Sequence, residues 1–194
     1  MCEQASQEFG ERRKVQGFSL LELLVTIAVL TVVVGIALPN MREFVVGNRL
    51  SSDVNSFIGL INYARSEAIA RNQDVMVCPK AAGAQTCAST TSWNTHDIQA
   101  FVDEDGSGQR NGAEEPLKTL AAVDPSNTNM GFDQGSELPL VFGSAGFARN
   151  AQSFKIHVKS DDEAYVARFG RTVCVSRAGR VRVVAYTVST CPDF

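Results

Sequence analysis

The sequence predicts an α+β protein in which a long N-terminal helix leads into a β-rich domain that carries disulfide bonds. Three observations predict this class: an apolar run over residues 18–38, a helical stripe of apolar side chains after it, and alternating segments beyond Asn72. The length of 194 residues fits one domain with an appended segment. Hydrophobic residues make up 44% of the chain and charged residues 20%, which excludes a disordered or collagen-like protein.

The apolar run from Phe18 to Leu38 carries a single charge, Glu22. As a helix it would be about 32 Å long, at about 1.5 Å per residue, and could cross a hydrocarbon core of about 30 Å. A buried core helix rarely has this length without a polar face, and a signal peptide has a shorter apolar region. Basic residues 12–14 precede the run and no comparable cluster follows it. We therefore expect residues 1–17 to stay in the cytoplasm and the chain beyond Leu38 to be exported.

The segment around the start of this run resembles the processing site of type IV prepilins and type II secretion pseudopilins. A charged leader ends in Gly17, an aromatic residue, Phe18, follows it, and Glu22 stands at the fifth position of the mature chain. Pro39 lies where that family carries a helix-weakening proline. The resemblance implies the type IV pilin fold, removal of residues 1–17 by prepilin peptidase, and N-methylation of Phe18.

Glu22 is the one residue of the run that calls for a partner. A carboxylate at the centre of a bilayer costs about 2.5–3.5 kcal/mol on insertion scales, and less near the interface. Cleavage would place a cationic amine on Phe18, and in a staggered helical stack this amine can meet Glu22 of the next subunit. We expect the partners to be other major and minor pilins or pseudopilins, prepilin peptidase and the inner membrane, with the pilus filament at the cell surface as the final location.

Residues 39–73 predict a second, amphipathic half of the same helix that packs on a sheet and ends at Asn72. Charged residues, among them Arg65, lie largely off its apolar stripe. Gly35 and Pro39 interrupt the upper part, where we expect local unwinding in an assembled filament. The stripe recurs at spacings of three and four residues and consists of Leu50, Val54, Phe57, Ile61, Ala64 and Ala68.

Residues 74–194 predict an exported, β-rich head domain. Alternating apolar and polar residues, separated by turns rich in Gly, Asn and Asp, indicate its strands. The strands are expected at residues 74–78, 97–102, 117–122, 139–142, 153–159, 164–168, 171–175 and 180–188.

The end of the helix carries a second resemblance. Residues 63–73, leading into Val77-Cys78-Pro79, resemble the GspH/FimT/FimU group of minor pilins and pseudopilins, in which a similar helix end runs into the first strand. The two resemblances together cover residues 17 to about 80, and the remainder matches only in outline.

Five cysteines are present, and Cys2 belongs to the leader. The other four lie in the exported domain, where disulfides persist, and four cysteines allow three pairings. We favour Cys78–Cys87, which closes a short loop, and Cys174–Cys191, which ties down the C-terminal strand. A zinc site is disfavoured because the spacings form no paired CxxC motifs.

The acidic segment from Asp103 to Glu114 reproduces the spacing of a calcium-binding loop. Asp103, Asp105 and Glu114 stand at positions 1, 3 and 12, Gly108 at position 6 and Ser107 at position 5. The flanking segments indicate strands rather than the paired helices of an EF-hand. We interpret the segment as a polar hairpin loop and keep calcium binding as the alternative.

An enzymatic function is not indicated. The chain contains no GxSxG, HExxH or P-loop motif, and it has two histidines, His96 and His157. We interpret both histidines as strand or loop residues, and we expect no cofactor and no catalytic residue.

The C-terminal sequence Gly179-Arg180-Val181-Arg182 resembles the DNA-binding motif of the FimT branch, which helps to capture DNA in natural transformation. Arg180 and Arg182 are two residues apart and therefore on one face of a strand, and Gly179 permits a tight turn before them. Arg177 and Arg171 are candidate accessory contacts to the phosphates of double-stranded DNA.

Charge does not decide between DNA binding and a solvated strand face. The net charge is +3 over residues 155–194 but −6 over residues 74–154.

The leading functional hypothesis from the sequence is a minor pilin or pseudopilin that joins or primes a filament. The alternatives are a DNA-binding minor pilin of the FimT type and a GspH-like pseudopilin of the type II secretion system.

Overall fold

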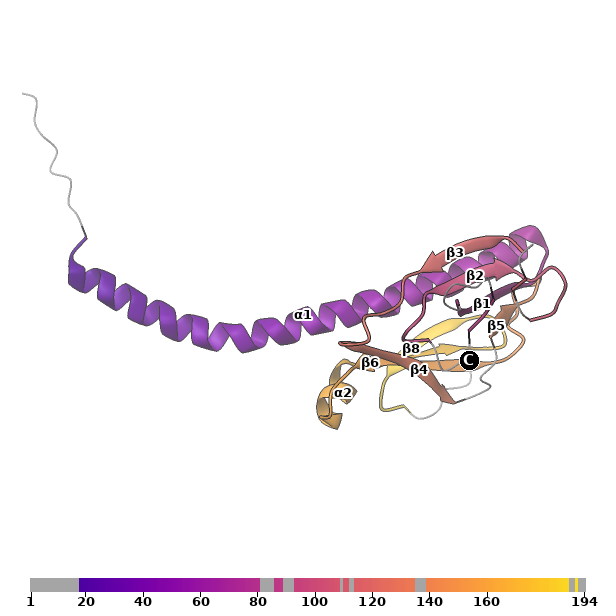
Figure 1. The fold of residues 1–194 in the computed structure, drawn as a ribbon. Helices are drawn as coiled ribbons and strands as arrows, with labels where there is room; N and C mark the ends of the chain where they lie inside the picture. Colours follow the sequence, from indigo (N-terminus) through magenta and orange to yellow (C-terminus); the bar gives the residue numbers. More distant parts are fainter. Residues whose placement is uncertain are drawn as a thin grey trace, which may run out of the picture. The chain divides into compact units, whose positions relative to one another are not determined.

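The computed structural model describes residues 18–80, 86–88, 93–108, 110–111, 114–134, 139–188 and 191; for residues 38–40, 42 and 132–134 it describes the backbone only. The chain divides into two compact units, Met1–Glu43 and Phe44–Phe194. The second unit combines the end of a long helix with two antiparallel sheets (Figure 1), so the predicted α+β class is confirmed.

The first element is the 52-residue helix α1, Leu20–Arg71. The helix ends because Asn72 adopts a left-handed backbone conformation with φ of 55°. In this turn the N–H of Asn72 donates to the carbonyl of Ile69, and the N–H of Gln73 donates to that of Ala68. Asn tolerates this conformation better than most residues, so the predicted stop at Asn72 is confirmed.

The first sheet has the strand order β3-β2-β1-β5, and its neighbouring strands are antiparallel. The central strand β1 begins three residues after Asn72 and pairs on both sides. A register shift between Ala100 and Phe101 bends the pairing of β2 with β3. The strands are β1 (Val75–Pro79), β2 (Ile98–Val102), β3 (Pro116–Leu120) and β5 (Leu140–Phe142).

The second sheet has the order β4-β6-β7-β8 and is also antiparallel. Its last strand, β8, pairs only with β7 among the described strands, so it forms an edge. The strands are β4 (Thr128–Gln134), β6 (Gln152–Val158), β7 (Arg171–Val175) and β8 (Val181–Ala185), and helix α2 (Glu163–Phe169) lies between β6 and β7 in the chain.

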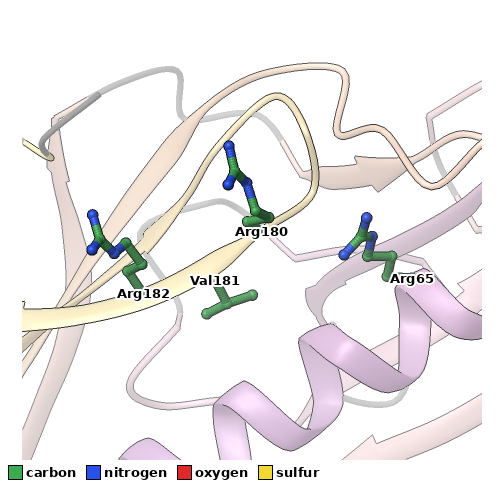
Figure 2. A pocket seen from close by; sticks show the side chains of 4 residues that line it. All are labelled: Arg65, Arg180, Val181 and Arg182. Atoms are coloured by element: carbon green, nitrogen blue, oxygen red, sulfur yellow. The ribbon is translucent and has the colours of Figure 1, made fainter. Parts of the chain in front are cut away.

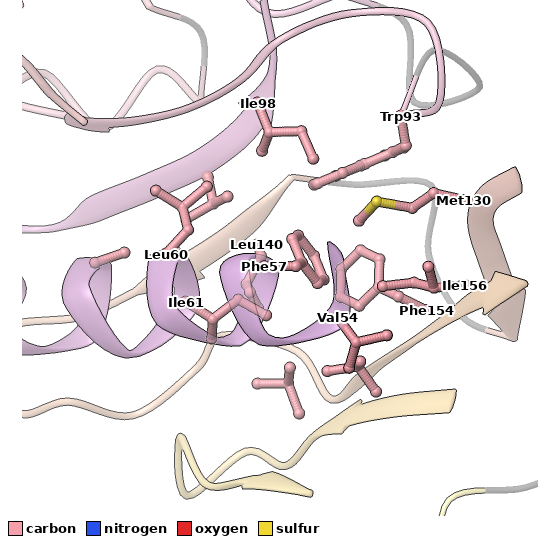
Figure 3. Packing of buried hydrophobic residues seen from close by; sticks show 14 of the residues in the cluster. Val54, Phe57, Leu60, Ile61, Trp93, Ile98, Met130, Leu140, Phe154 and Ile156 are labelled. Atoms are coloured by element: carbon pink, nitrogen blue, oxygen red, sulfur yellow. The ribbon is translucent and has the colours of Figure 1, made fainter. Parts of the chain in front are cut away.

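The main core forms where the second half of α1 meets both sheets. All six residues of the predicted stripe are buried in one cluster with strand residues, which confirms that this half of the helix packs on a sheet. Figure 3 shows the centre of the cluster, where Phe57 of α1 lies against Trp93 and Phe154. Ring centroids are 4.9–6.0 Å apart in edge-to-face geometry, the preferred arrangement of aromatic pairs.

A smaller cluster lies on the other face of the first sheet. Alternate residues of a strand point to opposite faces, so Val75 and Val77 of β1 belong to the main core while Met76 and Cys78 belong to this cluster. Phe101 and Val141 complete it, with Cys87 packed against it.

One expectation about secondary structure is wrong, and one strand was not predicted. Residues 164–168 form helix α2 rather than a strand, because the Asp162 side chain accepts hydrogen bonds from the N–H groups of Ala164 and Tyr165 and so caps a helix. Strand β4 was not expected at all. Gly131 and the polar residues Asn129, Asp133 and Gln134 weaken the strand signal of this segment, and pairing with β6 supplies the order that the local sequence lacks.

The two favoured cysteine pairs are disulfide-bonded in the structure. Cys78–Cys87 closes a nine-residue separation beside the small cluster, and Cys174–Cys191 joins β7 to the chain that follows β8. Cys78 and Cys174 are both fully buried.

Candidate functional site

The first candidate site is the start of α1, which exposes a continuous apolar surface. Phe18 is 83% exposed, and the segment Leu20–Ala37 is long and apolar enough to cross a membrane, with none of it buried. Exposed apolar surface of this extent is typical of a segment that lies in lipid or against other proteins. The large side chains exposed there are Leu20, Leu21, Leu23, Leu24, Val25, Ile27, Val29, Leu30, Val32, Val33, Val34 and Ile36.

Glu22 stands in the first turn of this apolar helix. The Ser19 hydroxyl accepts a hydrogen bond of 3.2 Å from the Glu22 N–H, and the Ser19 carbonyl accepts one from Leu23. Ser19 is therefore the N-terminal cap, and Glu22 occupies the third helical position, as in a capping box. A carboxylate here is favoured by the helix dipole. The Glu22 side chain is exposed and available to a group outside the chain.

Two residues assigned to processing and assembly have limited structural description. Gly17 lies outside the described residues. At Pro39 the backbone of α1 is helical, and its side chain is outside the described set.

The second candidate site is a pocket at the edge of the second sheet. It has a volume of about 370 Å³ and is lined by Arg65, Arg180, Val181 and Arg182. Figure 2 shows Arg180 and Arg182 on one side of β8 and Val181 on the other, with Arg65 reaching in from α1. The pocket therefore brings together the two arginines of the predicted motif and a third one from the helix.

Arg65 holds the turn that carries this motif. Its Nε donates to the carbonyl of Gly146 at 2.9 Å, and its Nη2 donates to the carbonyl of Ala178 at 3.1 Å. In the sequence, Arg65 stands on the polar side of the predicted helix, and nothing there indicates a role for it. Its partners lie 81 and 113 residues away in the chain, so no local pattern could have identified them.

Gly179 is required at this turn for two separate reasons. Its φ is +72°, in the region that residues with a side chain rarely adopt. A Cβ atom on it would lie 2.2 Å from the Gly146 carbonyl oxygen and 2.7 Å from Arg65 Nε. The turn thus depends on glycine, as the sequence predicts.

The two accessory arginines have different surroundings. Arg177 is exposed in the turn between β7 and β8 and lies near the motif in the chain. Arg171 lies at the other end of β7, where it pairs with Ala185, and its Nη1 donates to the carbonyls of Arg168, Phe169 and Gly170. Arg171 therefore caps the end of α2 and does not line the pocket.

The acidic segment forms the connection of the β2–β3 hairpin, as its flanking strand signals predict. The structure brings the carboxylates of Asp103, Asp105 and Glu114 together, with candidate ligand oxygens within 4.8 Å of one another. The histidines lie apart from this group: His157 Nδ1 is 2.8 Å from the Val158 carbonyl, and His96 Nδ1 is 2.9 Å from the Thr95 hydroxyl.

Comparison with known families and structures gives two matches in different parts of the chain. Residues 53–179 match the family described as type II transport protein GspH, and residues 12–38 match the prokaryotic N-terminal methylation motif. No curated protein sequence matches significantly.

Two solved structures share the fold. The type IV minor pilin FimU of Pseudomonas aeruginosa aligns with 19% identity and a TM-score of 0.52, covering 73% of this chain and 92% of FimU. The minor pseudopilin EpsH of the Vibrio cholerae type 2 secretion system aligns with 15% identity and a TM-score of 0.51, covering 72% of this chain and 99% of EpsH. Both likenesses show a type IV pilin fold.

Proposed function

Because the chain belongs to the GspH family and is a minor pilin or pseudopilin of the GspH/FimU type, we propose that it is a processed filament subunit that assembles through its N-terminal helix. In this proposal prepilin peptidase removes residues 1–17, and the helix anchors the chain in the inner membrane with the head on the exported side. The mature chain then joins or primes a filament together with other pilins or pseudopilins.

The observation that carries this proposal is the apolar helix surface with one carboxylate near its start. None of the segment Leu20–Ala37 is covered by the chain itself, so lipid or neighbouring subunits must cover it. Glu22 lies four residues after Phe18, where processing would create a cationic amine. In a staggered stack the amine of one subunit can reach Glu22 of its neighbour, which neutralises both charges inside an apolar filament core.

Replacement of Glu22 tests this pairing. Glu22→Ala removes a carboxylate from the membrane segment, so we expect insertion and folding to continue while recovery in sheared filaments falls. Glu163→Ala is the matched control, because Glu163 is also an exposed acidic residue in the first turn of a helix, but in the head. Recovery of Glu22→Ala in filaments at the level of the control would contradict the pairing.

A second candidate function, DNA capture, is favoured by the arginine pocket. Three guanidinium groups line one open pocket at a sheet edge, and guanidinium groups suit phosphate contacts. Arg65 is held by two backbone carbonyls, so it fixes the position of the turn, while Arg180 and Arg182 are exposed. Binding of this kind would be weakly dependent on sequence and strongly dependent on salt.

A titration with duplex DNA at two salt concentrations tests the DNA hypothesis. Arg180→Gln/Arg182→Gln should lower the log–log salt slope by about 2, since each phosphate contact contributes roughly 0.9. The control Lys159→Gln/Arg168→Gln removes the same charge from exposed positions that do not line the pocket. The DNA hypothesis fails if the unaltered protein has no salt-sensitive affinity, or if both double variants weaken binding equally.

A further inference from the structure

The β2–β3 connection brings three acidic side chains together, although they are separated by up to eleven residues in the chain. Asp103 follows directly after β2, Asp105 lies in the next turn, and Glu114 precedes β3. Each can offer a carboxylate oxygen, and these oxygens lie within 4.8 Å of one another. The filament assembly and the DNA capture proposed above do not involve these three carboxylates.

Asp103 is the member of the group whose environment needs an explanation. It is 3% exposed, and neither carboxylate oxygen has a hydrogen-bond donor among the described residues. Arg110 of the same connection is also buried, but its Nη1 donates to Gln99 Oε1 at 3.3 Å. A buried carboxylate without a donor is strongly unfavourable, so the oxygens of Asp103 call for a cation as their partner.

The other two carboxylates are oriented by hydrogen bonds from the connection itself. Asp105 accepts from the Ser107 N–H and the Asn111 side-chain amide, each at 2.9 Å. Glu114 accepts from the Glu104 N–H at 3.1 Å and the Asn111 N–H at 2.8 Å.

We propose that the connection from Asp103 to Glu114 binds one Ca²⁺ ion through the carboxylates of Asp103, Asp105 and Glu114. The three acids stand at positions 1, 3 and 12 of a calcium-loop spacing, and Gly108 at position 6 has the positive φ, +73°, that the sharp turn requires. Ser107 and Asn111, at positions 5 and 9, offer further oxygens. An all-oxygen set suits Ca²⁺ rather than Zn²⁺, which prefers nitrogen and sulfur.

The ion would hold the connection over the small apolar cluster of the first sheet. Gly108 faces this cluster, because a Cβ atom on it would lie 3.7 Å from Met76 Cε. Arg110 contacts Gln99 of β2, whose Nε2 in turn lies 3.9 Å from Cys78 Sγ. Calcium binding is therefore expected to stabilise the head, and the calcium of an extracellular medium would supply the ion.

The test uses the full chain in detergent, freed of metal with EDTA and then dialysed. Calorimetric titration with CaCl₂ should show one ion per chain, with a dissociation constant on the order of 10⁻⁴–10⁻³ M as in extracellular modules. Trp93 is the chain's one tryptophan and is fully buried, so its fluorescence reports unfolding of the head. At a calcium concentration ten times the dissociation constant, the unfolding equilibrium constant should fall about 11-fold. An equal concentration of MgCl₂ should have a much smaller effect.

Two variants and one control assign the binding to these residues. Asp103→Asn and Asp105→Asn should each abolish the calcium-dependent shift, and the exposed Asp105 keeps the test valid if the Asp103 variant does not fold. Glu104→Gln removes the same charge from an exposed, non-ligating position of the same connection and should keep the shift. The proposal is overturned if the unaltered chain shows no calcium-dependent shift at millimolar calcium. It is also overturned if the Asp105→Asn chain keeps the shift.

Discussion

Replacement of Gly179 by alanine tests whether the turn before Arg180 is built on the contact between Arg65 and the two carbonyls. The left-handed conformation costs a residue with a side chain about 1–2 kcal/mol. The new Cβ would also lie 2.2 Å from the Gly146 carbonyl oxygen, which is backbone and cannot move away cheaply, and 2.7 Å from Arg65 Nε. The turn must therefore shift, and the two charge-assisted hydrogen bonds of Arg65 weaken.

The expected loss combines these terms. A hydrogen bond from a charged group contributes about 1.5–3 kcal/mol, so losing one of the two together with the conformational cost of about 1–2 kcal/mol gives about 2.5–5 kcal/mol for Gly179→Ala. Gly106→Ala is the matched control, because Gly106 has φ of +68° but no atom within 4 Å of its would-be Cβ. That variant should lose only about 1–2 kcal/mol.

The assay is urea denaturation of the full chain in detergent, followed by the fluorescence of Trp93. Equal losses in the two glycine variants would refute the reasoning, because they would mean that the contact with Gly146 and Arg65 contributes nothing. A larger loss of stability in Gly179→Ala than in Gly106→Ala would show that Gly179 is required for the structure of the turn, independently of any DNA binding.

Two further predictions concern the head. The pKa of Asp124 lies below its ordinary value of 3.8, chiefly because the Ser126 hydroxyl and N–H donate to its carboxylate. Asp124 therefore stabilises the folded head at pH values above 3.8, and this stabilisation is lost as the pH falls through the lowered pKa. Asp124→Asn should therefore reduce the difference in melting temperature between pH 6 and pH 2.5. Asp53→Asn should increase this difference, because burial raises the pKa of Asp53. Equal changes in the two variants would contradict the opposite pKa shifts. Cys174→Ser/Cys191→Ser opens a separation of 17 residues and should cost about 3 kcal/mol in urea denaturation, and an unchanged midpoint would mean that the bond does not restrain the unfolded chain.

The long helix and its buried stripe could be predicted from the sequence because periodicity persists over many turns. Strands β1 and β7 were expected within a residue of their bounds, since each is a short apolar run bounded by turns. Helix α2 was mistaken for a strand because seven residues are too few for either period to be distinguished, and Asp162 was the capping signal that decides it.

The candidate sites could be predicted only as far as local sequence determines them. The spacing of Arg180 and Arg182 placed them on one face, but Arg65 joins them through tertiary contacts that no local pattern contains. The acidic segment was found by its spacing. The burial of Asp103 depends instead on how the connection folds over the sheet, and it is this burial that favours an ion there.

The central claim is that the chain works as a processed subunit of a filament, and mass spectrometry of sheared filaments tests it most directly. A non-tryptic peptide that begins at Phe18 and carries one methyl group on its amine is the predicted result. Filaments that contain no peptide of this chain, or a chain that keeps residues 1–17 in cells with active prepilin peptidase, would contradict the account.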